Sequence, residues 1–353
     1  MMLPRQSWRH WLRQNFFADG FSTLISLVLG TLAAVALVNV LDWALFSAVF
    51  RPEVELCRSL DHGGACWGVI AEKYRIILFG RYPFDEQWRP LAATLLLLSL
   101  IVISGHPASW RRGLLPVWLF SLALMLLLMK GGFGGLTRVD TDLWGGLPLT
   151  LLLTVVGIGG AFPLAVLIAV GRSSSLGVLR SVLTWYVELV RGMPLIPILF
   201  LASFLFPLFL PKDLSVDVLV RVLAAIILFA AAYLSESIRG GLESIPATQR
   251  EAALALGLTS WQAMLLVLLP QALRAVVPSI VNSAISLFKE TSLVTVVSMF
   301  DLTGALSLAL AGDALWRPFH LEGYLFIGAI YWIGCFSMSR YSLWIEARLR
   351  TPA

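Results

Sequence analysis

Residues Arg250–Pro270 read REAALALGLTSWQAMLLVLLP. Just upstream, Ser244–Pro246 is typical of a helix start, because serine accepts first-turn amide bonds and proline fits where no donor is needed. Gly257 is a natural left-handed stop. Thr259 and the glutamine three residues on resemble a capping box that starts another helix. The stretch predicts a short helix over Gln249–Leu256, a turn and a second helix.

The composition around this stretch is that of a membrane protein. Apolar residues make up 58% of the chain and charged residues only 13%. A bilayer core of about 30 Å needs about 20 apolar residues per crossing, and each crossing must be helical because lipid offers no hydrogen bonds. Eight segments fit this pattern: 21–41, 91–106, 114–130, 148–170, 182–210, 220–238, 262–286 and 321–339. We expect an all-α polytopic membrane protein with about eight transmembrane helices.

Some of the apolar segments are irregular. Segments 91–106 and 114–130 are short, and their separation depends on a tight turn at Arg111–Gly113. Segment 182–210 is too long and carries three prolines, so we expect a broken helix. Residues 300–320 are too polar and irregular for a span and predict a re-entrant piece with an external loop.

The charges predict the orientation in the membrane. The first apolar segment outlasts the about 7 to 15 residues of a signal-peptide core, so we favour an uncleaved span over a cleaved signal. Eight crossings then place both termini in the cytoplasm and the longer 51–90 loop outside. The charges of this loop say little about orientation, because long loops cross the membrane largely regardless of charge. Short segments on the cytoplasmic side hold Arg5, Arg9, Arg13, Arg111, Arg112, Arg172, Arg180, Arg239, Arg250, Arg340, Arg348 and Arg350. The net charge of +5 is therefore explained by the orientation in the membrane, and it does not indicate nucleic-acid binding.

Two cysteines lie in the predicted external loop. Cys57 and Cys66 form a candidate disulfide, since an oxidising compartment favours a bridge over free thiols. Cys335 lies in the last span and is interpreted as a packing residue. Asp61 and His62 beside Cys66 could suggest a metal ligand set, but the spacing is unlike that of a zinc finger. We expect no metal site.

The sequence contains no familiar catalytic motif. It has no GxxxxGK[ST], HExxH or GxSxG pattern, and its four histidines are scattered. Asp301 and Asp313 lie in an irregular region without the paired arrangement of an intramembrane aspartyl protease. We expect no catalytic residues.

The short helix of the opening stretch predicts a docking surface. Ala252, Ala253 and Ala255 remove side-chain bulk, so the backbone of another protein can come close, and Glu251 adds a charge. The alternative is an amphipathic helix lying on lipid. Such helices favour several Lys or Arg residues on one face and bulky apolar residues on the other, and Arg250 alone fits that poorly.

Charged residues inside the spans indicate a candidate pathway. Charges in a membrane normally face a cavity or each other. Both signs together would suit a zwitterion, which presents a carboxylate and an ammonium. A structural salt bridge at a helix break is the alternative. The candidate residues are Glu188, Arg191, Lys289, Glu290, Thr291 and Ser292.

The spaced pattern of the opening stretch resembles the cytoplasmic loop motif of ABC importer permeases, EAA, three residues, G, nine residues, I, one residue, LP. The matching residues are Glu251, Ala252, Ala253, Gly257, Leu269 and Pro270, with Val267 in place of the isoleucine. Across 148–350 the chain is similar to polar amino acid permeases in VELVRGMPL (187–195), ESIRGGLESIP (236–246) and FKETSLV (288–294). Residues 66–90, CWGVIAEKYRIILFGRYPFDEQWRP, resemble the general L-amino acid transport permease.

This resemblance implies a type I ABC importer fold. A five-span core over 148–353, with a coupling loop at about 240–262, would follow an extension over 1–147 with three spans and an external loop at about 51–90. It implies that the chain is not an enzyme and binds no cofactor, with ATP and Mg on a separate ATPase. The coupling residues would be Arg250, Glu251, Ala252, Ala253 and Gly257.

The resemblance also implies partners in a bacterial inner (plasma) membrane. These are membrane lipid, two copies of an ABC ATPase subunit, an external or periplasmic amino acid binding protein, and a homologous permease, as a heterodimer rather than a homodimer. An ion-coupled secondary amino acid transporter is the alternative, but it would be expected to show internal repeats with paired interrupted helices. A membrane scaffold or sensor would not need charges within its spans.

Overall fold

The computed structural model describes residues 8–59, 63–110, 113–211 and 214–350. Contacts divide the chain into two compact units. The first contains Met1–Glu72 with Pro318–Glu322, and the second contains Lys73–Arg317 with Gly323–Ala353. Some residues named in the sequence predictions lie outside the described residues: Arg5, Asp61, His62, Arg111 and Arg112. The predicted tight turn at Arg111–Gly113 and the alternative metal ligands Asp61 and His62 therefore fall there too.

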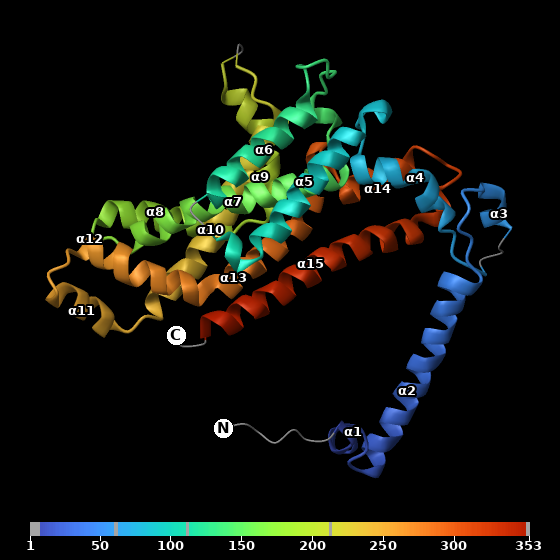
Figure 1. Ribbon diagram of the computed structural model, residues 1–353, viewed down its shortest axis with the longest axis horizontal. Coiled ribbons are helices and arrows are strands. Elements are labelled where there is room, and N and C mark those ends of the chain that lie inside the picture. The colour runs from blue at the N-terminus through green and yellow to red at the C-terminus, as the bar shows by residue number, and fades with distance from the viewer. Residues whose placement is uncertain (1–7, 60–62, 111–112, 212–213, 351–353) are drawn as a thin grey trace. The chain divides into compact units, whose positions relative to one another are not determined.

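The described residues form helices almost throughout (Figure 1). In chain order these are α1 (Trp8–Phe16), α2 (Gly20–Leu41), α3 (Val54–Arg58), α4 (Gly68–Phe79), α5 (Trp88–Ser104), α6 (Leu114–Lys130), α7 (Gly146–Arg172), α8 (Gly177–Arg191), α9 (Leu195–Phe200), α10 (Val218–Glu243), α11 (Ala247–Ala255), α12 (Ser260–Gln262), α13 (Leu269–Glu290), α14 (Leu302–Ala311) and α15 (His320–Arg350). The two-residue strand β1, Phe300–Asp301, pairs with Gly145 and Gly146.

The predicted spans fall on helices. Within the described ranges, six helices are long and apolar enough to cross a membrane, and a bent pair makes a seventh. Helix α6 is an apolar helix of 17 residues and is shorter than these. The all-α multispan prediction is confirmed, with six or seven full-length spans where the sequence predicted about eight.

The predicted broken helix is confirmed at residues 177–209. Helix α8 ends at Arg191, and the chain turns by 108° before α9 and the turns that follow it. Pro194 has an extended ψ of 156° immediately before α9. Proline cannot donate to the preceding turn and disfavours helical backbone in the residue before it, so the helix stops here.

Helices α7, α10 and α13 form the core of the second unit. Helix α7 presents Gly157, Ala161, Ala165 and Ala169 at four-residue spacing, and all four are buried. A Cβ at Gly157 would lie 2.8 Å from Ile226 and 2.9 Å from Leu287. Small residues at this spacing let helices pack closely where lipid gives no hydrophobic driving force between them.

A buried arginine locks α5 to α6. The guanidinium of Arg89 donates to the carbonyl oxygens of Leu128 at 2.7 Å, Thr137 at 2.9 Å and Met129 at 3.2 Å. Its side chain is fully buried and lies 3.5 Å from the Glu86 carboxylate. The last carbonyls of a helix have no partners within it, so this cation both satisfies them and complements the negative end of the helix dipole.

Replacing Arg89 by alanine is expected to destabilise the second unit. Three carbonyl oxygens would lose the guanidinium as a donor, and only that of Met129 would keep the Tyr82 hydroxyl, which donates to it at 2.8 Å. A buried acceptor left unsatisfied costs about 1–3 kcal/mol. We expect a loss of about 3 kcal/mol in the free energy of unfolding, measured on the purified chain in mixed micelles. Arg138, in a pair with Asp140 that is 69% and 66% exposed, is the control, and Arg138→Ala should change the value by less than about 0.5 kcal/mol. Equal losses in the two variants would contradict the lock.

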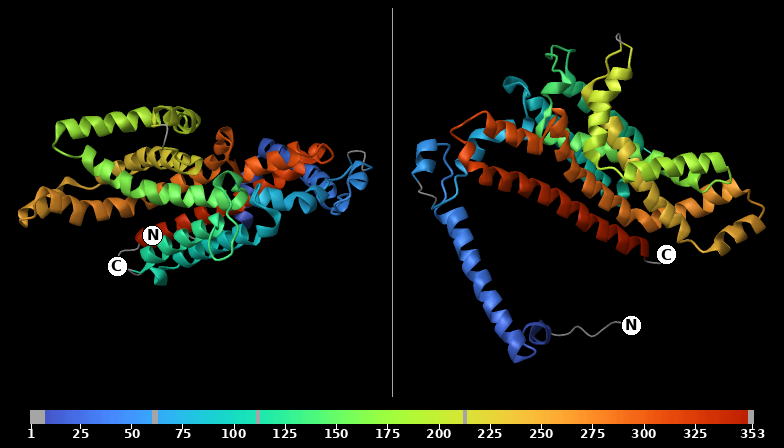
Figure 2. Two further views of the ribbon diagram at one scale, coloured as in Figure 1. Left: turned by 90° about the horizontal axis from the view of Figure 1, so that it is seen from above. Right: turned by 180° about the vertical axis from the view of Figure 1, so that it is seen from behind.

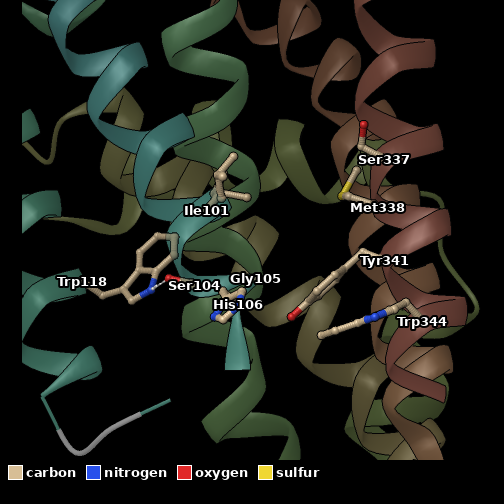
Figure 3. Close-up of a pocket in the computed structure, with 10 residues that line it drawn as sticks. Ile101, Ser104, Gly105, His106, Trp118, Ser337, Met338, Tyr341 and Trp344 are labelled. Atoms are coloured by element: carbon tan, nitrogen blue, oxygen red, sulfur yellow. Dashed lines mark hydrogen bonds between the residues drawn. The ribbon is translucent and has the colours of Figure 1, made fainter. Parts of the chain in front are cut away.

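A cavity of about 560 Å³ lies between the ends of α5 and α6 and the face of α15 (Figure 3). Its walls are apolar and aromatic, with polar groups at Ser104, His106 and Ser337. The close approach of Gly105 and Tyr341 places the end of α5 beside the last turns of α15. The predicted topology requires these two ends to lie on the same side of the membrane.

The segments between spans contain short helices. The predicted 51–90 loop carries α3 and α4, which were not predicted. Residues 300–320 hold the ten-residue α14, too short to cross a bilayer that needs about 20 residues. Lys73 of α4 pairs with Asp313 at 2.7 Å, and this hydrogen bond lowers the pKa of the Asp313 carboxyl.

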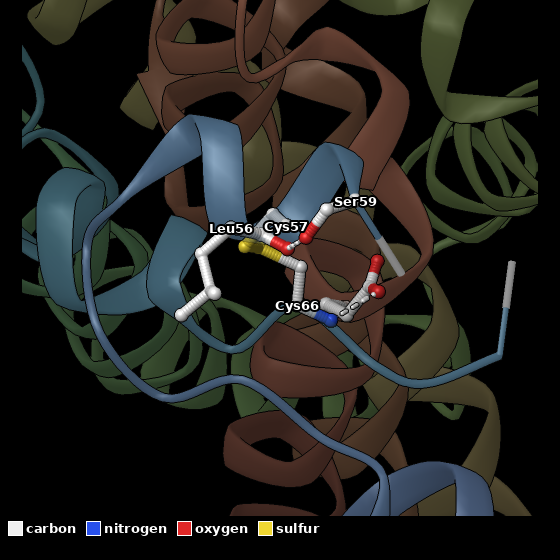
Figure 4. The surroundings of a disulfide bond; sticks show 5 residues. Leu56, Cys57, Ser59 and Cys66 are labelled. Atoms are coloured by element: carbon white, nitrogen blue, oxygen red, sulfur yellow. Dashed lines mark hydrogen bonds between the residues drawn. A yellow bond between two sulfur atoms is a disulfide. The ribbon is translucent and has the colours of Figure 1, made fainter. Parts of the chain in front are cut away.

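In the first unit, Cys57 of α3 and Cys66 are joined as a disulfide (Figure 4). Their Cα atoms are 5.5 Å apart, and both residues are buried. The backbone N–H of Cys66 donates to the carboxylate of Glu322 at 2.9 Å, which fixes the second half of the bridge.

A non-reducing peptide map of the chain purified from its native membrane should recover the Cys57 and Cys66 peptides as one linked species. The physical reason is the oxidising compartment in which the topology predicted from the sequence places them. Cys335, a free thiol in α15, serves as the internal control and should be alkylated. Alkylation of all three cysteines without prior reduction would contradict the bridge.

Candidate functional site

Helix α11 ends in a Schellman motif at Gly257. The N–H of Gly257 donates to the Leu254 carbonyl at 2.9 Å, and the N–H of Leu258 donates to the Ala253 carbonyl at 3.2 Å. Gly257 has φ +86°, the left-handed region that glycine adopts without strain. The predicted glycine stop is confirmed.

The next helix begins with the predicted capping box. The Thr259 hydroxyl oxygen accepts from the Gln262 N–H, and the Gln262 side-chain oxygen accepts from the Thr259 N–H at 2.9 Å. A π-helical turn over Ala263–Leu268 then leads into α13. Figures 1 and 2 show the α11–α12 turn projecting from one end of the helix bundle.

The predicted role of Ser244 was wrong. The N-cap of α11 is Pro246, without a side-chain hydrogen bond, and the helix starts at Ala247. Ser244 instead follows α10, and its hydroxyl donates to the Gly241 carbonyl at 2.7 Å. The cause is that α10 runs on to Glu243, whose last turn offers unpaired carbonyls close to that hydroxyl.

The outer face of α11 is accessible. Arg250, Glu251, Ala252 and Gly257 are exposed, whereas Ala253 is buried and points inward. A Cβ at Gly257 would meet nothing within 4 Å. The helix–turn–helix therefore presents small side chains and two charges of opposite sign on a surface that the described residues of this chain leave uncovered.

Two large apolar side chains lie on the same surface. Leu256 is 84% exposed and Trp261 is 60% exposed, on either side of the Gly257 turn. We did not single them out from the sequence. The signal was present, since Leu256 and Trp261 are bulky residues in a segment too short and polar to enter the bilayer. We call Arg250–Trp261 the coupling surface, after the role that the sequence resemblance implies for it.

A carboxylate of α10 joins the ends of α7 and α8. Glu236 of α10 lies 2.7 Å from Arg172 at the end of α7 and 2.5 Å from Arg239. It also lies 3.7 Å from Arg191 at the end of α8. Arg239 in turn pairs with Glu243 in the last turn of α10. Because arginines at the ends of α7 and α8 pair with this carboxylate, a displacement of α10 would strain or break their ion pairs.

A second cavity, of about 270 Å³, lies between α10 and α13. Polar groups at helical spacing form one wall, and aromatic and apolar groups form the other. Its lining comprises Phe229, Ala230, Tyr233, Ser279, Asn282, Ser283, Ser286, Leu287 and Glu290. We call it the polar cavity. The Ser279 hydroxyl donates to that of Ser237 at 2.8 Å, which ties α13 to α10 beside it.

One of the predicted pathway residues lines the polar cavity, and a second lies beside a residue of its wall. Glu290 lines the polar cavity, and the Arg191 guanidinium lies 5.7 Å from the ring of Tyr233, which lines it too. Glu188 and Lys289 are exposed and do not line it. The Thr291 and Ser292 hydroxyls also lie apart, donating to carbonyls in their own helix end at 2.9 and 2.8 Å.

Four polar residues of the cavity were missed from the sequence. Residues 279, 283, 286 and 290 repeat every three or four positions, which is one face of a helix. A polar stripe on an otherwise apolar span indicates a face turned away from lipid. From this signal, one polar helix face that lines a cavity could have been predicted, comprising Ser279, Asn282, Ser283, Ser286 and Glu290.

Spanning helices around a polar cavity, with an exposed helix–turn–helix at one end, define a membrane permease. The model of the family "binding-protein-dependent transport system inner membrane component" matches residues 161–351. The chain belongs to this family.

Relatives over almost the whole chain are amino-acid ABC transporter permeases. The inner membrane amino-acid ABC transporter permease protein YhdY of Escherichia coli is 40% identical over 347 residues, covering 97% of this chain and 93% of YhdY. The glutamate/glutamine/aspartate/asparagine transport system permease protein BztC of Rhodobacter capsulatus is 35% identical over 405 residues, covering 96% of this chain and 93% of BztC. A crystal structure of an amino acid ABC transporter with histidines aligns with a TM-score of 0.52 at 29% identity, covering 57% of this chain and 92% of that chain.

Proposed function

We propose that this chain is the permease subunit of an ATP-driven importer of L-amino acids, coupled through Arg250–Trp261 to a separate ATPase. The observation that carries the proposal is the exposed coupling surface, with Leu256 at 84% exposure beside a left-handed glycine turn. ATP and Mg would be bound by the ATPase, and this chain would supply the pathway and the coupling helix.

The chemistry of the coupling surface supports a protein partner. Leu256 and Trp261 offer apolar side chains to a groove, and bulky apolar anchors in a pocket carry most of the binding energy of protein interfaces. Glu251 adds a charge, and Ala252 permits close approach. The Glu236 cluster connects this end of α10 to α7 and α8, so movement at the surface would reach the spans.

The polar cavity supports a small zwitterionic substrate. Glu290 would bind the substrate ammonium, and serine hydroxyls would bind either charged group of the substrate. Arg191, which lies against the cavity residue Tyr233, would bind the substrate carboxylate. Both long relatives are named as permeases of amino-acid systems. The amino acid class is the substrate that the cavity and the relatives together favour.

The assembly and placement are part of the same proposal. Two ATPase copies, a homologous permease in a heterodimer and an external amino acid binding protein would complete the transporter. Both termini would lie in the cytoplasm of a bacterial cell, with the chain in its inner membrane. Residues 1–147 would form an extension before a permease core over 148–353.

Affinity purification of the intact chain from its native membrane tests the proposal. We expect an ATPase subunit and a second permease to come with it, and uptake of labelled L-amino acids by proteoliposomes that depends on enclosed ATP. Recovery without an ATPase, together with uptake driven by an ion gradient alone, would replace the proposal by the secondary-transporter alternative. A single permease sequence in the purified complex would contradict the heterodimer.

A further inference from the structure

The proposed transport function does not use the 560 Å³ cavity between α5, α6 and α15. One wall belongs to the end of α5 and the start of α6, with Ile101 and Trp118, and the other to α15, with Met338, Tyr341 and Trp344 (Figure 3). The cavity therefore lies between a helix pair of the extension and the last span of the core.

The aromatic walls of this cavity are held in place. The indole N–H of Trp118 donates to the Ser104 hydroxyl at 2.9 Å, and that of Trp110 donates to the Ser104 carbonyl at 2.9 Å. On the opposite wall, the rings of Tyr341 and Trp344 stack with centroids 5.7 Å apart. These contacts fix the orientation of the rings on both walls.

The mouth of the cavity opens on apolar surface. Val102 lines it and is 75% exposed, and Leu115 nearby along α6 is 67% exposed. Both lie in segments predicted from the sequence to cross the membrane, so this mouth would face lipid. An apolar slot of this kind suits an acyl chain, because burial of each CH₂ contributes about 0.8 kcal/mol.

Cationic and polar groups lie at one end of the same slot. The Arg348 guanidinium lies 4.2 Å from the Trp344 ring, and Arg340, exposed, is one helical turn before Trp344. Across the slot, the Nδ1 atom of His106 accepts from the Ala108 N–H at 3.3 Å, so its Nε2 carries the proton in the neutral ring. Aromatic rings with adjacent cations are typical of the lipid headgroup level.

We propose that this cavity binds one anionic phospholipid of the cytoplasmic leaflet. An acyl chain would fill the slot between Val102 and Met338, and the phosphate would lie at Arg340, Arg348 and His106. Basic pockets between spans on the cytoplasmic side are suited to acidic lipid headgroups. The bound lipid would join the extension to the last span where protein contacts leave a gap.

Native mass spectrometry of the purified chain tests this proposal. The chain is released from nanodiscs of phosphatidylglycerol and phosphatidylcholine, and retained lipids are counted. Ser337→Trp fills the cavity, and Ser339→Trp, on an exposed position of the same helix outside the lining, is the matched control. We expect Ser337→Trp to retain one fewer phosphatidylglycerol per chain, and Ser339→Trp to match the unaltered chain. Identical retention in all three proteins would overturn the proposal.

Charge and occupant are tested separately. The double change Arg340→Gln and Arg348→Gln should abolish the preference for phosphatidylglycerol over phosphatidylcholine while thermal unfolding midpoints stay within a few degrees. If the double variant still preferred phosphatidylglycerol over phosphatidylcholine, the phosphate would not lie at Arg340 and Arg348. A photoreactive amino acid at position 337, activated in the native membrane, should yield a lipid adduct, and a protein adduct would show that another polypeptide fills the slot.

Discussion

Replacement of Gly257 by glutamate should lower energy-dependent uptake at least tenfold, while the chain still inserts into the membrane. Gly257 has φ +86°, where a residue with a Cβ is strained by about 1–2 kcal/mol. A Cβ there meets nothing within 4 Å, so the folded chain has room for the new side chain. The charge would project from the coupling surface into the interface. Uptake of a labelled L-amino acid mixture by cells that depend on this chain is the measurement.

Two matched variants separate strain from a blocked interface. Gly257→Asn keeps the left-handed turn, because asparagine tolerates that region, and adds no charge. It should retain most of the uptake. Gly177→Glu adds the same charge at another exposed glycine with open space, outside the coupling surface, and should leave uptake unchanged. Uptake that falls equally in the Gly177 and Gly257 glutamate variants, or in neither, would refute a specific coupling role for this turn.

Glu290→Gln should weaken the apparent affinity for the transported amino acid by about 10- to 100-fold. Glutamine keeps the size of the side chain but removes the charge that would face the substrate ammonium. A hydrogen bond to a charged group contributes about 1.5–3 kcal/mol, and each 1.4 kcal/mol is about tenfold in affinity. The KM for uptake into ATP-loaded proteoliposomes is the measurement, with maximal velocity as its companion.

The neighbouring charges provide the controls for Glu290. Glu188→Gln and Lys289→Gln each remove one charge from an exposed position outside the polar cavity. Their KM values should stay within about twofold of the unaltered protein. A KM that does not change in Glu290→Gln, or that changes equally in the three variants, would remove Glu290 from the pathway.

The sequence was sufficient for much of the fold. Apolar runs predicted the positions of the spans, because the bilayer sets helix length and permits little besides helix. The Gly257 stop and the Thr259 capping box depend only on residues a few positions apart, and both are confirmed. The Ser244 assignment failed because α10 and α11 compete for the same hydroxyl, and the end of α10 is set by its packing on α7 and α13.

The site could be predicted only in part, because its contacts join distant segments. Glu188 and Arg191 share a helical face, yet Arg191 pairs with Glu236, 45 residues away, and Glu188 faces outward. The arrangement follows from the bend after α8, whose angle no local pattern contains. The polar cavity likewise needs α10 beside α13, although its serine stripe was visible in the sequence. The exposure of Leu256 depends on what the rest of the chain leaves uncovered.

The most direct test of the coupling surface is photo-crosslinking from Leu256. A photoreactive amino acid replaces Leu256 in the intact chain, and a second protein carries it at Val178, a first-turn residue of α8 that is 81% exposed but outside the coupling surface. We predict that irradiation of native membranes yields an adduct between position 256 and an ATPase subunit, and no such adduct from position 178. Only lipid adducts from position 256, or equal ATPase adducts from both positions, would contradict the account.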